Sequence, residues 1–223
     1  LVIAGGISFA VMGDLGKNIV KRIKCALTGR YEKLSFSINT SVVISFTLFL
    51  LVSGTLLVYF FEHGNSLKGQ PVHVQYLTAF FQSVSLRSAG FNTIPFASLA
   101  PATLFMMAMY MFVGGASGST AGGIKVNTLA VIAASLRSSL KKQETVIIYN
   151  REVVRGTVIK AFSLLAFALA TVCAGSFLLL ATEKGNPLSL LFEVVAAFTT
   201  VGISSGITSS LTPAGKIIII ILM

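Results

Sequence analysis

The chain has 223 residues, of which 54% are hydrophobic and 11% are charged, and its mean hydropathy is +0.87. Soluble domains carry about 25% charged residues, so this composition excludes an ordinary soluble domain and indicates a membrane protein. The formal net charge of +10 would suit a nucleic-acid-binding protein. The placement of the basic residues decides against that class.

Twelve of the basic residues lie in two polar stretches, and the two other polar connections carry one lysine each, Lys68 and Lys184. The twelve are Lys17, Lys21, Arg22, Lys24, Arg30, Lys33, Arg137, Lys141, Lys142, Arg151, Arg155 and Lys160. Basic connections stay on the cytoplasmic side of a membrane. The charge therefore predicts a topology with both basic stretches inside the cell, and we expect no nucleic-acid partner.

The chain starts in an apolar run without a basic beginning, which is not the pattern of a signal peptide. It stops inside a second apolar run at 217–223. We therefore expect a piece of a longer membrane protein. Residues 37–61 form the first apolar run of 25 residues, long enough to cross a bilayer of about 30 Å. Residues 74–86 are apolar but too short to cross, which indicates a re-entrant helix.

The next apolar piece, 101–113, is also short, and residues 124–140 complete its crossing after an interruption. The interruption consists of ten small or hydroxylated residues: Gly114, Gly115, Ala116, Ser117, Gly118, Ser119, Thr120, Ala121, Gly122 and Gly123. Each of its five glycines would cost a helix about 1 kcal/mol relative to alanine. Irregular backbone at membrane depth is tolerated where protein covers it or where it lines a watery cavity. We predict an unwound segment facing a transport path; close helix packing through small-xxx-small spacing is the alternative.

The pattern then starts again, because residues 157–181 form a second spanning run and residues 187–198 a second short piece. At an offset of 112, the segment Ser88-Ala89-Gly90-Phe91 aligns with Thr200-Val201-Gly202-Ile203. The same offset aligns Pro101-Ala102 with Pro213-Ala214. Each unit thus comprises a spanning helix, an outer loop, a short re-entrant helix, a glycine-centred hairpin and a second crossing. Binding sites of transport proteins commonly lie between such repeats.

Glycine-centred hairpins at membrane depth suit the binding of a monovalent cation. Backbone carbonyls can replace the hydration shell of an ion without holding it too tightly to leave. Aiming successive carbonyls at one axis needs unusual dihedral angles, which glycine adopts at low cost. Arg87 precedes the first hairpin, and Glu193 lies in the second short helix. We expect Arg87 to anchor its hairpin through carboxylate or carbonyl partners, with a direct electrostatic role as the alternative.

Three segments together, 80–93 (FFQSVSLRSAGFNT), 114–125 (GGASGSTAGGIK) and 198–208 (FTTVGISSGIT), resemble the Trk/Ktr/HKT superfamily of potassium transporters. The likeness is greatest to the membrane subunit of Ktr-type systems and covers essentially the whole chain. It implies an all-α membrane protein, built from repeated membrane–pore–membrane units with re-entrant pore helices and a broken helix. Four such units surround one pore in that superfamily, as in voltage-gated channels.

By this resemblance, residues 1–15 end a preceding unit, 37–140 form the third unit and 157–223 a truncated fourth. Residues 16–36 and 141–156 are then cytoplasmic loops. The resemblance also assigns Ser88, Ala89, Gly90, Phe91, Thr200, Val201, Gly202 and Ile203 to the selectivity filter, where potassium would bind. Residues 114–123 match its intramembrane gate loop. Ser88 stands where threonine is common, a departure that keeps the hydroxyl.

The resemblance implies gated potassium uptake across the plasma membrane by a multi-pass protein, with sodium as a possible second ion and no cofactor. It also implies a homodimer in the lipid bilayer, associated with a cytoplasmic nucleotide-binding regulatory subunit. A coupled cation symporter with its substrate site at the broken helix is the alternative, although residues 114–123 carry no carboxylate for coupling. No HExxH motif or Ser/His/Asp set is present, so we do not expect an enzyme.

Overall fold

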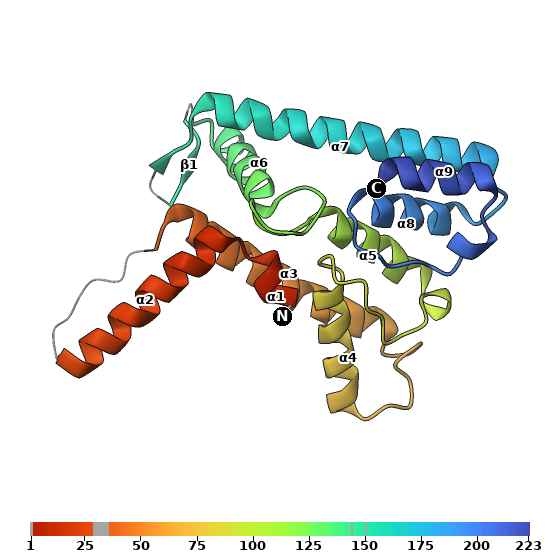
Figure 1. Cartoon of the computed structure of the whole chain (residues 1–223), viewed down its shortest axis with the longest axis horizontal. Coiled ribbons are helices and arrows are strands. Elements are labelled where there is room, and N and C mark those ends of the chain that lie inside the picture. Colours follow the sequence, from red (N-terminus) through yellow and green to blue (C-terminus); the bar gives the residue numbers. More distant parts are fainter. Residues whose placement is uncertain (1, 29–35, 144, 150) are drawn as a thin grey trace.

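The structure is a computed structural model that describes residues 2–28, 36–143, 145–149 and 151–223. Its elements are almost all helices (Figure 1). In chain order they are α1 (Val2–Gly6), α2 (Phe9–Thr28), α3 (Ile38–Glu62), α4 (Val72–Ser85), the 3-10 turn η1 (Phe96–Ser98), α5 (Pro101–Phe112), α6 (Val126–Leu140), β1 (Ile147–Ile148), β2 (Arg151–Glu152), α7 (Arg155–Thr182), α8 (Pro187–Phe198), the 3-10 turn η2 (Thr208–Ser210) and α9 (Pro213–Leu222).

Two helices, α3 and α7, are long and apolar enough to cross a membrane. Only about a third of the most apolar stretch of each is buried within the structure, 33% and 28% respectively. Large side chains such as Phe60 and Phe167 stay exposed, at 77% and 73%. A core helix of a soluble protein would hide such side chains, whereas a lipid-facing helix displays them. The chain is therefore a membrane protein.

The two predicted units are present in the same order of elements. In each, a long helix packs against a short helix and a second crossing: α3 against α4 and α5, and α7 against α8 and α9. Both long helices run in the same direction (Figure 1), and α5 packs on α8 to join the units. The shared core includes Phe96 and Phe192, whose ring centroids are 5.6 Å apart.

Local sequence explains where the helices begin. Proline occupies the first turn of α5, α8 and α9, where its missing N–H is not needed. Side chains also cap the starts of α3 and α8: the Ser37 hydroxyl accepts from the Thr40 N–H at 3.2 Å, and the Asn186 side chain accepts from the Leu188 N–H at 3.0 Å. Such signals are local, and the expected bounds of α3, α5 and α8 agree with the structure to within one residue.

A carboxylate at the end of each long helix, buried at Glu62 and half-buried at Glu183, ties the unit together. Glu62, the last residue of α3, accepts from the N–H of Ala100 at 3.0 Å and from the Thr103 hydroxyl, both at the start of α5. Glu183, just after α7, accepts from the N–H of Thr212 at 3.0 Å, at the start of α9. A carboxylate at a helix N-terminus satisfies free N–H groups and complements the helix dipole. This repeated clasp is not evident from the sequence, because its partners lie about 30–40 residues apart.

The structure corrects two expectations about the polar connections. Residues 16–28, expected as a loop, continue α2, because lysine, arginine and leucine are good helix formers and no proline intervenes. The expected helix at 1–15 is instead broken between α1 and α2, where the Ser8 hydroxyl accepts from the Val11 N–H at 3.4 Å. Residues 29–35, with Arg30 and Lys33, lie outside the described residues.

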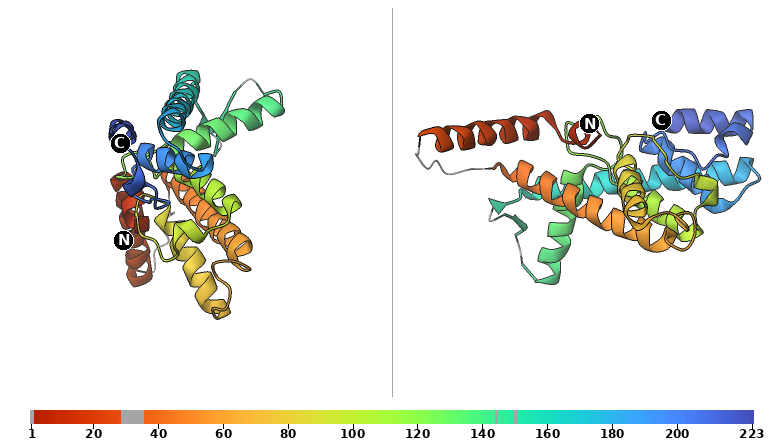
Figure 2. Two further views of the ribbon diagram at one scale, coloured as in Figure 1. Left: turned by 90° about the vertical axis from the view of Figure 1, so that its right-hand side faces the viewer. Right: turned by 90° about the horizontal axis from the view of Figure 1, so that it is seen from below.

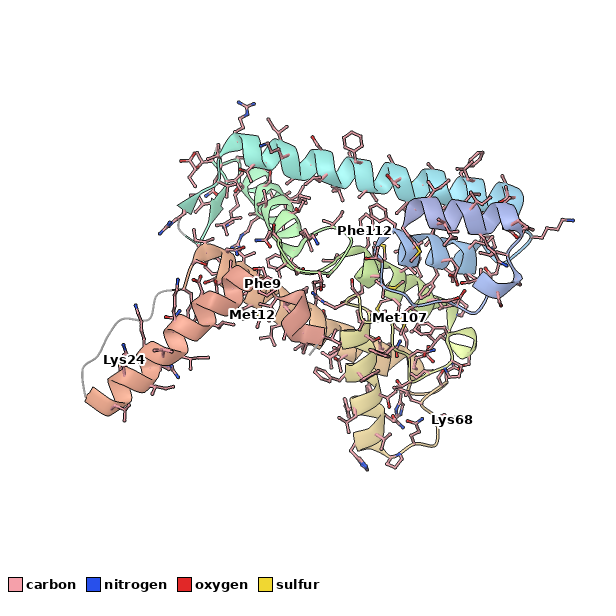
Figure 3. The ribbon with its side chains drawn as sticks, viewed as in Figure 1. Phe9, Met12, Lys24, Lys68, Met107 and Phe112 are labelled. Carbon is pink, nitrogen blue, oxygen red and sulfur yellow. The ribbon has the colours of Figure 1, made fainter. Side chains whose placement is uncertain are left out.

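The second connection contains a small antiparallel hairpin, β1 and β2, which pairs Ile147 with Glu152 and Ile148 with Arg151. Tyr149 in its turn takes a φ of 47°, and its hydroxyl lies 2.9 Å from the Ser45 hydroxyl on α3. Helix α2 extends away from the other helices, as the right-hand view of Figure 2 shows. Lys24, on α2, and Lys68, in the loop between α3 and α4, consequently lie far apart (Figure 3).

Candidate functional site

Each short helix is followed by a hairpin whose backbone repeats the same unusual conformation. After α4, Ser88 and Gly90 have φ values of 59° and 77°; after α8, Thr200 and Gly202 have 50° and 81°. Ala89 and Val201, between them, do not share the positive φ. A left-handed residue other than glycine costs about 1–2 kcal/mol, so its occurrence at the same place in both units is a specific structural feature.

This alternation of positive and negative φ orients the peptide groups. Successive peptide groups then turn their N–H to one side and their carbonyls to the other, whereas an extended strand alternates them. The hydroxyl-bearing residues Ser88 and Thr200 occupy the first left-handed position, and glycine occupies the second. The unusual dihedral angles expected from the sequence are thus present at both glycine-centred segments.

The two segments lie side by side, main chain against main chain. A Cβ placed on Gly90 would be 3.0 Å from the carbonyl oxygen of Val201 and 3.4 Å from that of Gly202. A Cβ placed on Gly202 would lie 3.7 Å from the Cα of Gly90. The carbonyl oxygens of one segment therefore approach the glycine of the other. Residues 112 positions apart in sequence meet at one place, although Phe91 itself is exposed and Ile203 is buried.

Different side chains hold the two segments. In the first of the two units, the Ser85 hydroxyl at the end of α4 donates to the Phe91 carbonyl. In the second unit, Glu193 on α8 has only 4% of its surface exposed. Its Oε1 accepts from the Ser204 hydroxyl at 2.7 Å and from the N–H and hydroxyl of Ser205 at 2.8 and 2.9 Å. Its Oε2 accepts from the Thr208 hydroxyl at 2.8 Å.

Residues 113–125 break the crossing between α5 and α6, as expected for an unwound segment. The break is closed at its base: the Gly114 N–H donates to the Ile124 carbonyl at 2.8 Å, and the Ile124 N–H donates to the Phe112 carbonyl at 3.1 Å. Because the segment is not helical, the alternative of a continuous helix with small-xxx-small spacing is wrong. Figure 3 shows Phe112 where α5 ends and this loop begins.

The loop contacts both glycine-centred hairpins. A Cβ on Gly122 would lie 2.3 Å from the Thr199 carbonyl oxygen and 2.5 Å from the Thr200 hydroxyl, so this approach requires glycine. Arg87 Nη1 lies 3.5 Å from the Gly114 carbonyl oxygen, to which it donates. Arg87 therefore uses a carbonyl partner, one of the two kinds that the sequence analysis expected. Its Nη2 is buried without a partner among the described residues.

The far side of the loop is attached to α1. The Ala116 N–H donates to the Gly6 carbonyl at 2.9 Å, and the Thr120 hydroxyl donates to the Gly5 carbonyl at 3.4 Å. These carbonyls are free because the helix ends there. The sequence analysis did not single out Gly5 and Gly6, although a Gly-Gly pair inside an apolar run is a recognisable signal for a helix end.

The chemical groups of this region suit a monovalent cation more than a tightly held metal. Across the described ranges, no three His, Cys, Asp or Glu side chains converge as metal ligands. The two carboxylate oxygens of Glu193 are already occupied by hydroxyl and N–H donors. Main-chain carbonyls of the two segments remain as neutral ligands, which bind an ion without holding it permanently.

Known proteins resemble the chain throughout its length. The family model TrkH, described as "Cation transport protein", matches residues 1–223. The chain is 36% identical to the Ktr system potassium uptake protein B of Bacillus subtilis (strain 168), over 100% of this chain and 48% of that protein. It is 31% identical to the potassium/sodium uptake protein NtpJ of Enterococcus hirae, over 100% and 48%.

Among solved structures, the potassium transporter TrkH from Vibrio parahaemolyticus superposes with a TM-score of 0.75 at 19% identity, over 100% of this chain and 47% of that one. The chain therefore spans about half the length of the relatives that it matches. The structural likeness supports the fold of repeated membrane–pore–membrane units. The family match covers the whole chain, and the chain belongs to the TrkH family of cation transport proteins.

Proposed function

We propose that this chain forms two of the four pore units of a gated potassium-uptake protein in the plasma membrane. The observation that carries the proposal is the pair of glycine-centred segments, 88–91 and 200–203, which share their left-handed backbone and lie in contact. Carbonyls arranged in this way can replace the water around potassium. Sodium is a possible second ion, and the name of the relative NtpJ includes both ions.

The wider assignments belong to the same proposal. Residues 1–15 end a preceding unit, 37–140 form the third and 157–223 the fourth, while 16–36 and 141–156 face the cytoplasm. The wide separation between Lys24, on α2, and Lys68, in the loop that follows α3, supports this topology. The complete protein works as a homodimer with a cytoplasmic nucleotide-binding regulatory subunit, and it transports ions without catalysing a reaction. We do not favour a coupled symporter, because the broken segment 114–123 carries no carboxylate.

Residues 114–123 act as the gate in this proposal. The loop contacts the hairpin of each unit and is held on its other side by the α1 carbonyls of Gly5 and Gly6. Release from α1 would let the loop move without unfolding a helix, because its own hydrogen bonds join its two ends. The gate is therefore a small element with defined contacts that can be altered singly.

Substitution of the two glycines tests the filter assignment in the complete protein. We expect Gly90→Ser and Gly202→Ser each to raise the potassium KM by about 5- to 30-fold, since a side chain in the left-handed region costs about 1–2 kcal/mol. Gly90→Ser should have the larger effect, because its Cβ would meet the Val201 carbonyl oxygen at 3.0 Å. Initial uptake rates of labelled potassium, with and without sodium, measure the change.

Gly64→Ser is the matched control, because a Cβ on Gly64 meets no atom within 4 Å. It should leave the KM for potassium and the preference over sodium unchanged. If Gly90→Ser and Gly202→Ser behave like this control, at equal amounts of protein in the membrane, the filter assignment is wrong.

A further inference from the structure

A groove at the basic end of the molecule has no role in the proposed ion path. It lies where the start of α3, the end of α6 and the hairpin β1–β2 meet, at the end of the molecule from which α7 starts (Figure 1). Its volume is about 580 Å³, within the range of about 300–1,000 Å³ that small-molecule sites occupy. Both spanning helices begin at this end, so the groove lies at the edge of the membrane.

One wall of the groove is a stripe along α6. Ala130, Ala133, Ala134, Arg137 and Lys141 line it at helical spacings of three and four residues. The alanine side chains are small and therefore leave the groove open, and the two long basic side chains lie at the C-terminal end of α6. At about 1.5 Å per residue this stripe is roughly 16 Å long. The groove is therefore apolar along its length and positively charged at one end.

The other walls come from α3 and the hairpin. Val42 and Phe46, one turn apart on α3, face the alanine stripe, and Ile147 with Tyr149 closes the side. The hydrogen-bonding distance of 2.9 Å between the Tyr149 and Ser45 hydroxyls holds the hairpin against α3. Phe46 lies about 12 Å along the axis from the first residue of α3. The apolar part of the groove thus extends to the depth of lipid acyl chains.

The two basic residues are available to a ligand. Arg137 and Lys141 are exposed, and neither forms an ion pair with any residue that the structure describes. Both belong to the basic connection that the positive-inside pattern assigns to the cytoplasmic side. The inner leaflet of a membrane carries anionic phospholipids, which are attracted to such positions.

We propose that this groove binds one anionic phospholipid of the inner leaflet. The headgroup phosphate lies between Arg137 and Lys141, and an acyl chain lies along the alanine stripe against Phe46. Arginine and lysine donate charge-assisted hydrogen bonds to phosphate oxygens, and the alanines provide the apolar surface that an acyl chain buries. Basic pockets between membrane helices on the cytoplasmic side recognise anionic headgroups in this way. This site is independent of the filter assignment.

Native mass spectrometry of the complete protein, titrated with phosphatidylglycerol or with phosphatidylcholine of the same chains, tests the proposal. We expect the double variant Arg137→Gln/Lys141→Gln to weaken phosphatidylglycerol binding about 25-fold, since each basic residue near a membrane surface contributes about a factor of five. Ala134→Phe keeps both charges but fills the groove, and it should weaken binding at least as much. Phosphatidylcholine binding should change in neither variant.

Arg151→Gln is the matched control, because Arg151 is an exposed arginine of the same connection that does not line the groove. Equal losses in the control and the double variant would show a diffuse basic surface and overturn the proposal. Unchanged phosphatidylglycerol binding by Ala134→Phe would also overturn the proposal. It would mean that the two basic side chains alone account for binding, as they would for free phosphate or for an acidic protein surface. Ala133→Leu provides a second, smaller obstruction, and each variant is compared at the oligomeric state of the parent protein.

Discussion

Glu193 is the residue whose surroundings most limit what can replace it. Its carboxylate receives four hydrogen bonds from three residues of the segment that follows Gly202, namely Ser204, Ser205 and Thr208. The equivalent position of the third unit, 112 residues earlier, is Phe81, which is exposed. The two units therefore share a backbone conformation at their glycines but hold it by different means. We interpret Glu193 as a positioning residue for the fourth unit's hairpin.

The substitution Glu193→Gln tests this role. Glutamine has nearly the size of glutamate, but an NH₂ donor replaces one of the two carboxylate oxygens. This donor would face the hydroxyl and N–H groups that donate to the carboxylate of Glu193. One buried donor left unpaired costs about 1–3 kcal/mol, so we expect the potassium-over-sodium preference to fall about tenfold. Competition between labelled potassium and sodium in uptake measures it. Glu193→Asp should restore part of the preference, because it keeps the charge.

Glu152→Gln provides the control, since Glu152 is an exposed glutamate on β2. A Glu193→Gln protein with lower total uptake but an unchanged ion preference would contradict the positioning role and indicate a general loss of stability.

The loop between α5 and α6 is the element that makes the third unit different from a plain pair of crossings. Its main chain closes on itself at Gly114 and Ile124, contacts the hairpin that follows α8 at Gly122, and bonds to α1 through Ala116. A small, glycine-rich segment can make all of these approaches because no Cβ stands in the way. Position 122 requires glycine because a Cβ there would clash with the Thr199 carbonyl oxygen, and not because of an unusual backbone conformation.

Shortening the loop by deletion of residues 116–121 should increase potassium flux, because it removes the hydrogen bonds of Ala116 and Thr120 that hold the loop against Gly6 and Gly5 of α1. The initial rate of labelled potassium uptake by the complete protein, at matched expression, measures the effect. Ser117→Ala is the control: Ser117 is exposed, and the bond that it makes to Asn127 uses its main-chain N–H. A lower flux from a normally expressed deletion would show that the loop has a packing role.

At the scale of the whole molecule, the two units α3–α4–α5 and α7–α8–α9 bring one glycine segment each to a shared place. The long helices expose apolar surface to the membrane, and the clasps at Glu62 and Glu183 fix the C-terminal ends of these helices. Two glycine segments cannot surround an ion by themselves; the family resemblance implies four around one axis.

We therefore expect the 223-residue chain, reconstituted alone into vesicles, to produce no potassium-selective flux. The complete protein in the same vesicles should produce it. Ion flux driven by a potassium gradient, with sodium substituted in a parallel sample, makes the comparison. A selective flux from the chain alone would contradict the four-unit proposal.

Local sequence determined much of this protein. Apolar length predicted α3 and α7, proline at a first turn marked α5, α8 and α9, and the offset of 112 identified Gly90 and Gly202 as equivalent. These features depend on residues that are close together in the chain, so a pattern of a few residues is enough to predict them. The extension of α2 and the hairpin β1–β2 could not be predicted from local sequence, because the residue types found in polar connections also form helices and strands.

Only the tertiary structure determined which residues from different elements are in contact. The contact of Gly90 with Val201, the bond of Ala116 to Gly6, the donors around Glu193 and the groove beside Arg137 join residues from separate elements. Nothing in the sequence near any one of these residues specifies its distant partner. Their meeting depends on how the helices pack, and that is set by the sum of many contacts across the whole fold.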